Sequence, residues 1–264
     1  MELSESLGKK LVTKKHESLP AFGLLSIVWG AVIFAVILAF KDTVLFSARS
    51  IPLLAVRFLF EIIQMELTIR AITQADRSTY GFLRIITIPL LLVVDVVLGY
   101  NLTIQDIFAV VIIVCALVML SMNHGIGKRG LWFVVGASVN AVITISLYKY
   151  SITHYNSLEL DQFIMYIGLV TYFAFRLIHK GESPFSVLRE GMFSAQSLSM
   201  ACHIPLMSYA YGLLPASVVA ASKRGLAVLG SVMSGSLYFH EKHLILKVLA
   251  CVLIGTAFLL LLFK

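Results

Sequence analysis

Residues 216–239 read ASVVAASKRGLAVLGSVMSGSLYF, an apolar segment long enough to cross a bilayer, with Lys223 and Arg224 adjacent about a third of the way along it. A charged side chain at the centre of the hydrocarbon region costs about 3 kcal/mol on insertion scales, so it persists where it faces a helical bundle or a wet cavity. The stretch therefore predicts a transmembrane helix whose two cations point into a bundle and bind an anion.

The rest of the chain has the same character. Of its 264 residues, 59% are hydrophobic and 13% are charged. Only helices or closed barrels satisfy the backbone inside a membrane, and the apolar segments have the length of helices. We therefore expect an all-α integral membrane protein with about nine transmembrane helices behind a polar N-terminal tail, residues 1–19. The predicted helices are 20–40, 54–73, 79–99, 104–122, 130–150, 159–178, 192–212, 216–239 and 244–263.

Lysine and arginine are concentrated in the tail and in the loops on its side, whereas the other side has little more than Lys41, Arg49 and Lys264. The positive-inside rule then places the N-terminus in the cytoplasm and predicts a multi-pass protein of the plasma (inner) membrane. No small-residue cleavage site follows the first apolar segment, so we expect that helix to be retained. The net charge of +7 is explained by these flanks and by intramembrane cations, without nucleic acid.

The chain contains an internal repeat. A shift of 140 residues superimposes the hydropathy profiles of predicted helices one to four on those of helices six to nine, with Arg84 falling on Arg224. The fifth predicted helix, 130–150, has no counterpart. Because five helices separate each segment from its counterpart, the two copies enter the membrane from opposite sides. This pattern is typical of carriers, which bind their substrate near the midplane between inverted repeats.

Residues 214–261, with a small-residue-rich helix, a Tyr-Phe-His-Glu-Lys turn and a final helix carrying Gly255, resemble the end of an EamA-type repeat. The chain is thus similar to the drug/metabolite transporter superfamily, whose usual form is ten helices in two inverted halves. The resemblance implies a first repeat at 20–122, lacking the usual first helix, and a second at 130–263. A missing helix would place the N-terminus opposite to the family's cytoplasmic side, whereas the charge pattern favours the cytoplasm.

A sharper resemblance concerns the cations. In sugar-phosphate translocators of this superfamily, a Lys-Arg pair on the penultimate helix and a lysine on the helix that opens the second half hold the substrate phosphate. Lys223, Arg224 and Lys149 occupy similar places, which implies an anionic or zwitterionic substrate. Arginine suits this role because its planar guanidinium binds an oxyanion in two places. Many EamA-like proteins carry a similar pair, so a phosphorylated ligand is not required.

Internal ion pairs are the alternative role for several charges. Arg57 and Glu61, and likewise Glu66 and Arg70, are four residues apart and can pair along one helix. Glu61 and Glu66 are five residues apart, about 140° around the helix, so both cannot face one small cavity.

Other polar residues of the apolar segments have two alternative roles each. We expect Arg84 to contact substrate or to pair with a glutamate of the preceding helix. Asn140 and His203 either line the substrate pathway or form interhelical hydrogen bonds. Tyr148, near the end of a predicted helix, is expected to anchor at the membrane interface.

The predicted function is a secondary transporter of a small anionic or zwitterionic metabolite, working by alternating access around a central electropositive site. A non-transporting scaffold or partner subunit of the same fold, or a translocator of lipid precursors, stays open. No metal-ligand spacing and no paired nucleophile and base occurs, so we expect no enzyme, metal or cofactor. The expected partners are a small-molecule substrate, the lipid bilayer and a second copy of the chain. The candidate substrate-binding residues are Lys223, Arg224, Lys149, Arg84, Asn140, His203 and Glu61.

Overall fold

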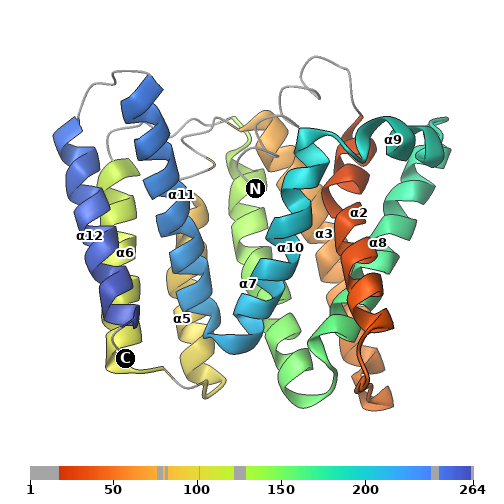
Figure 1. Cartoon of the computed structure of the whole chain (residues 1–264), viewed down its shortest axis with the longest axis horizontal. Helices are drawn as coiled ribbons and strands as arrows, with labels where there is room; N and C mark the ends of the chain where they lie inside the picture. Colours follow the sequence, from red (N-terminus) through yellow and green to blue (C-terminus); the bar gives the residue numbers. More distant parts are fainter. Residues whose placement is uncertain are drawn as a thin grey trace. The chain divides into compact units, whose positions relative to one another are not determined.

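The computed structural model describes residues 18–75, 80, 83–100, 102–121, 129–238 and 244–262 (Figure 1). This part of the chain is all-helical, with no strand. The predicted tail lies outside the described residues, apart from its last two positions. The α-helices are α2 (Leu19–Ala39), α3 (Ile51–Gln74), α5 (Thr87–Val97), α6 (Ile104–Ser121), α7 (Leu131–His154), α8 (Leu158–His179), α9 (Pro184–Gly191), α10 (Ala195–Leu213), α11 (Ala216–Tyr238) and α12 (Leu244–Leu262), with 3₁₀ turns η1 (Ala48–Ser50) and η2 (Arg84–Ile86).

Each of the nine predicted segments contains a helix, but two details differ. The segment predicted at 79–99 is not one continuous α-helix, because the 3₁₀ turn η2 precedes α5. Pro89 explains the break: it has no N–H to donate and its ring clashes with the preceding turn, so it is accommodated in the first turn of α5. The short helix α9 was not predicted, since its eight residues are neither long nor uniformly apolar.

Three of the described helices, α2, α7 and α8, are long and apolar enough to cross a membrane. The chain divides into two compact units, which we describe separately. Unit 1 comprises Met1–Gln74 and Ile143–Leu213, and unit 2 comprises Ala75–Val142 and Leu214–Lys264. Both predicted repeats contribute to both units, so the units are not the repeats themselves.

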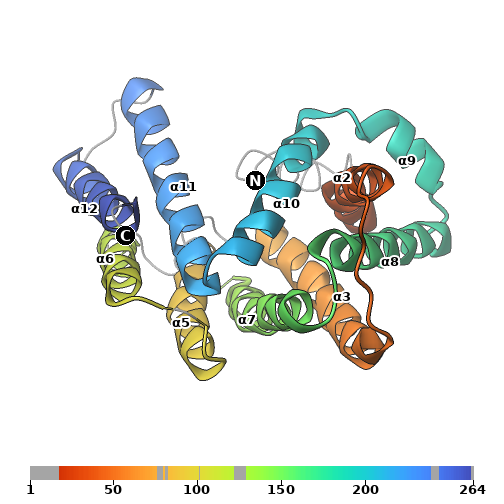
Figure 2. The same ribbon diagram turned by 60° about the horizontal axis from the view of Figure 1, so that its bottom comes forward.

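In unit 1, α2 packs along α8 in the opposite direction (Figures 1 and 2). Contacts along the pair show this direction. Ser18, which caps α2, donates a hydrogen bond to Glu182 beyond the end of α8, at 2.6 Å. At the other end, Lys41 forms an ion pair with Glu159 in the first turn of α8. Under the 140-residue shift, α2 and α8 are counterparts in the predicted repeat.

Two glycines set how closely α2 and α8 approach. A Cβ on Gly23 would lie 2.5 Å from Cε1 of Phe173, and one on Gly30 would lie 2.8 Å from Cδ1 of Tyr166. Both glycines and both aromatic residues are seven apart, so each pair lies on one face of its helix. Small residues that admit a partner at close range are a common device for packing helices in lipid.

The helix α10 completes the other side of α2 in unit 1. Ser197 donates a hydrogen bond to the Leu25 carbonyl oxygen at 2.8 Å, and the Trp29 indole donates to the Met192 carbonyl oxygen at 3.0 Å. Pro205 lies inside α10, where it removes one hydrogen bond of the helix.

In unit 2, α5 packs against α11 and α6 packs against α12. Asp95, near the end of α5, accepts hydrogen bonds from the backbone N–H groups of Ala216 and Ser217 at 3.2 and 2.7 Å, and thereby caps the start of α11. Because the end of α5 contacts the start of α11, these two helices are antiparallel. Ala116, Ala250 and Ile254 form a buried core between α6 and α12, which also run in opposite directions (Figure 1).

Candidate functional site

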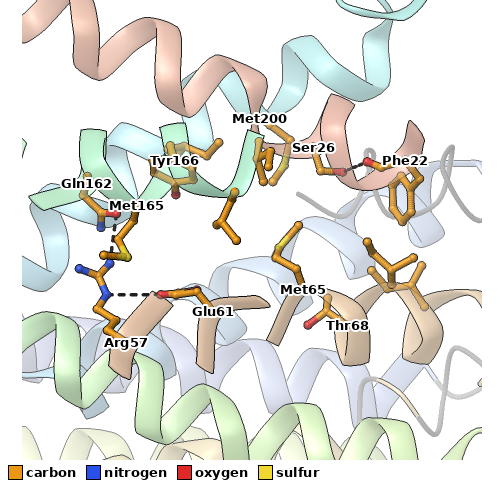
Figure 3. A pocket seen from close by; sticks show the side chains of 15 residues that line it. Phe22, Ser26, Arg57, Glu61, Met65, Thr68, Gln162, Met165, Tyr166 and Met200 are labelled. Atoms are coloured by element: carbon orange, nitrogen blue, oxygen red, sulfur yellow. Dashed lines mark hydrogen bonds and ion pairs between the residues drawn. The ribbon is translucent and has the colours of Figure 1, made fainter. Parts of the chain in front are cut away.

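A cavity of about 180 Å³ lies inside unit 1, among α2, α3, α8 and α10 (Figure 3). Its wall is mainly apolar and contains three methionines, one each from α3, α8 and α10. The charged side chains in the wall, Arg57 and Glu61, both come from α3. Figure 3 shows Arg57 and Gln162 at one end of the cavity and Phe22 toward the other.

Arg57 is held from four directions. Its guanidinium, 2% exposed, forms an ion pair and hydrogen bond with Asp161, and it donates to Gln162 Oε1 at 3.4 Å. It also lies over the ring of Tyr148, 4.6 Å from the ring centre. Its Nε is 3.6 Å from Oε1 of Glu61, one turn further along α3. The arginine is therefore fixed chiefly by α7 and α8, and Glu61 is the more distant of its two carboxylate partners.

The carboxylate of Asp161 is itself well supported. One oxygen pairs with Arg57, while the other accepts hydrogen bonds from Ser151 and, at 3.4 Å, from Asn156. Asn156 in turn donates to Ser50 at 3.0 Å and accepts from the Ser47 backbone N–H at 3.1 Å. Asp161 also lies in the first turn of α8, where the helix dipole favours a negative charge. These contacts fix the position of Asp161 and, through the ion pair, the position of Arg57.

Glu61 lacks such support. Among the described residues, the ionic partner of Glu61 is Arg57. The distance of 3.6 Å from Arg57 Nε to Glu61 Oε1 is longer than a charge-assisted hydrogen bond. One guanidinium faces two carboxylates, so with all three groups ionised this end of the cavity carries one excess negative charge.

The sequence-predicted site residues are divided between the two units. Glu61 lines the cavity of unit 1. Lys149 and His203 belong to the same unit, with Lys149 buried in α7 and His203 half-buried in α10, but neither is part of this cavity wall. Arg84, Asn140, Lys223 and Arg224 belong to unit 2. The role of all seven residues in substrate binding stays a prediction.

In unit 2, Arg84 donates a hydrogen bond to the hydroxyl of Tyr80 and lies over its ring, 4.9 Å from the centre. Asn140 is buried in α7, whereas Lys223 and Arg224 are half-buried in α11. Beside Arg224, Gly225 packs against α12, and its Cβ would lie 3.0 Å from Ile254.

The predicted pairs along α3 are both present. Arg57 lies near Glu61, and Arg70 is 3.8 Å from Glu66. Glu66 also accepts hydrogen bonds from Arg176 at 2.7 Å and from Tyr172 at 3.1 Å, outside the cavity wall. As the helical angle predicts, the two glutamates of α3 have different surroundings.

Two parts of the site were not found by sequence reasoning. Asp161 and Gln162 were overlooked, although an acid near the start of an apolar helix is a signal that a cationic partner exists. Tyr148 was expected at the membrane interface, and this is wrong: it is 3% exposed, carries Arg57 on its ring and donates a hydrogen bond to the Ser208 carbonyl oxygen at 3.0 Å.

No protein-family model matches this chain, and no curated protein is significantly similar to it in sequence. The likeness to the drug/metabolite transporter superfamily therefore rests on the residue patterns given above.

Proposed function

We propose that this protein is a multi-pass membrane carrier of a small metabolite, built from two inverted repeats. Support for the membrane comes from the three long apolar helices and from large apolar side chains on the outside of the described helices. Phe108 is 61% exposed, Trp132 is 80% exposed and Phe175 is 67% exposed. Such residues are stable against lipid chains but form an aggregation-prone surface in water.

The antiparallel pairing of counterparts supports the inverted repeat. Helices α2 and α8, α5 and α11, and α6 and α12 are related by the 140-residue shift, and each pair is in contact. Two copies of one motif that enter the membrane from opposite sides place matching helices antiparallel around a pseudo-two-fold axis. The helix α7 has no counterpart in this scheme.

One observation carries the carrier proposal: the cavity is lined by two pairs of repeat counterparts, α2 with α8 and α3 with α10. Carriers with inverted repeats bind substrate where the repeats meet, and they retain charged residues there although such residues are costly in a membrane. A scaffold subunit has no need for a cavity with an arginine and a glutamate in its wall. An anionic or zwitterionic substrate remains our expectation from Lys223 and Arg224.

The test is flux into proteoliposomes. We would measure uptake of labelled leucine, 3-methylbutylamine and inorganic phosphate, as a zwitterion, a cation and an anion. Met200→Trp fills the cavity, whereas Leu206→Trp adds the same ring to the same helix at a position that is 71% exposed. We expect uptake of at least one probe, lost in Met200→Trp and retained in Leu206→Trp. Uptake of all three no faster than in protein-free vesicles would favour the scaffold.

A further inference from the structure

We propose that the cavity of unit 1 binds the ammonium group of a ligand, with Glu61 as its counter-ion and the apolar wall around the body of the ligand. The inference rests on the proposed function only where it calls that ligand the transported substrate. Binding itself is a property of the cavity and is tested without transport.

The two carboxylates near Arg57 differ in how well their charge is compensated. Asp161 forms the close pair with Arg57 and has hydrogen bonds from Ser151 and Asn156 as well. Glu61 has the longer contact of 3.6 Å, so its charge is the less compensated of the two. A buried carboxylate that is only partly compensated is costly to ionise, and a ligand ammonium next to it stabilises the charged form.

The wall of the cavity is suited to the apolar body of such a ligand. Met65, Met165 and Met200 line the cavity together with the ring of Tyr166, and Figure 3 shows Met65 between Glu61 and the Phe22 end. Thioether side chains adapt to irregular apolar shapes, and the face of an aromatic ring attracts a nearby cation. A volume of about 180 Å³ suits an ammonium group with a short aliphatic body.

Because of Arg57, the ligand can carry a carboxylate as well as an ammonium group. The Nε of Arg57 is buried and makes no hydrogen bond in the described part of the chain, and its ionic partner is Glu61 Oε1 at 3.6 Å. Arg57 nevertheless lines the cavity, so its positive charge can also attract the carboxylate of an amino acid. The ammonium group is thus the chemistry shared by two kinds of ligand, a simple amine and an amino acid.

Three matched probes separate these ligands: 3-methylbutylamine carries the ammonium alone, 4-methylpentanoate carries the carboxylate alone, and leucine carries both on the same aliphatic body. We would measure their effect on the thermal unfolding of the purified full chain in detergent, since a ligand that binds the folded state raises its Tm. We expect a rise with the amine and with leucine, and none with the carboxylate. A greater rise with leucine identifies a zwitterion site, and a greater rise with the amine identifies a cation site.

The matched variants are Glu61→Gln and Glu66→Gln. Both remove one carboxylate from α3, but Glu66 lies outside the cavity wall and pairs with Arg176. We expect at least about tenfold weaker binding of the amine in Glu61→Gln, and unchanged affinity in Glu66→Gln. If Glu61→Gln fails to fold, Met200→Trp takes its place: it leaves Glu61 intact, fills the cavity and is expected to abolish the rise.

Three results would overturn the inference. They are a wild-type Tm that no ammonium probe raises, equal amine binding in Glu61→Gln and wild type, and binding of 4-methylpentanoate alone. The carrier proposal is tested separately. Amine binding without flux of any probe would support the ammonium site and contradict transport. Flux of phosphate without amine binding would support transport and contradict the ammonium site.

Discussion

The guanidinium of Arg57 in α3 and the carboxylate of Asp161 in α8 form an ion pair in which both side chains are almost fully buried, 2% and 0% exposed. The two residues are 104 positions apart, so the pair joins helices that are distant in the sequence.

This pair gives the first prediction. Asp161→Asn leaves the arginine with a poorly matched partner, and removal of one member of a buried pair typically costs about 3–5 kcal/mol. We expect a large fall in the Tm of the purified protein in detergent. Asp42→Asn, an exposed acid in the loop after α2, serves as the control and should change little. Equal effects of the two substitutions would mean that the ion pair does not hold α3 and α8 together.

The second prediction concerns the glycines between α2 and α8. Gly23→Ala places a methyl group 2.5 Å from the buried ring of Phe173, so the ring or the helices must shift, and we expect a loss of about 1–3 kcal/mol. Gly255 is also helical, but nothing lies within 4 Å of its Cβ position. Gly255→Ala should therefore be neutral, or stabilising by about 0.5–1 kcal/mol because alanine favours a helix. Thermal unfolding of both variants checks this contrast, and a reversed order would contradict the close packing.

A third prediction follows from the cap of α11. Asp95→Ala removes the acceptor for two backbone N–H groups, and loss of an N-terminal cap costs about 1–2 kcal/mol. Asp95→Asn keeps one acceptor oxygen and should lose less. Hydrogen exchange at Ala216 and Ser217 is the local measurement, and we expect it to accelerate most in Asp95→Ala. Unchanged exchange at both amides would show that another group caps the helix.

The fourth prediction is a pH dependence at the end of α8. Partial burial raises the pKa of the Glu182 carboxyl, but hydrogen bonds from Ser18 and Lys180, with the charge of Lys180, outweigh it and hold the pKa below its ordinary value. A lowered pKa in the folded state means that the contribution to stability is present above the ordinary pKa of glutamate and is lost as the pH falls through the folded-state value.

The measurement compares wild type with Glu182→Gln. We expect the wild type to be slightly more stable at pH 7, and the difference to shrink as the pH is lowered toward 4. The effect is small, because the carboxylate is partly exposed and water screens its pair with Lys180. A difference that stays constant over this range would rule out ionisation of Glu182 as its cause.

The helices were predictable because each one is an apolar segment bounded by residues with a local structural role. Pro20 lies at the start of α2, and Pro215 precedes α11, whereas α9 is short and less apolar and was not predicted. The proposed repeat register rests on the hydropathy of the sequence alone. The break before α5 depends on Pro89, which a window of average hydropathy does not detect.

The site was only partly predictable for a related reason. The spacing of Arg57 and Glu61 along one helix is visible in the sequence, and their pairing is present. The preference of Arg57 for Asp161 depends on how α3 packs against α7 and α8, and no local pattern contains that information. Tyr148 illustrates the same limit, because its position near a helix end suggests an interface whereas its actual neighbour is Arg57.

If the cavity binds a ligand as proposed, the methionines of its wall affect selectivity. A thioether chain has three rotatable bonds and no branch, so Met65, Met165 and Met200 can refill the space around guests of different outline at little cost. Such a wall discriminates poorly between branched, linear and cyclic bodies of equal bulk. Recognition then depends on the polar end next to Glu61, and the protein would accept a set of compounds that share a head group and differ in their tails.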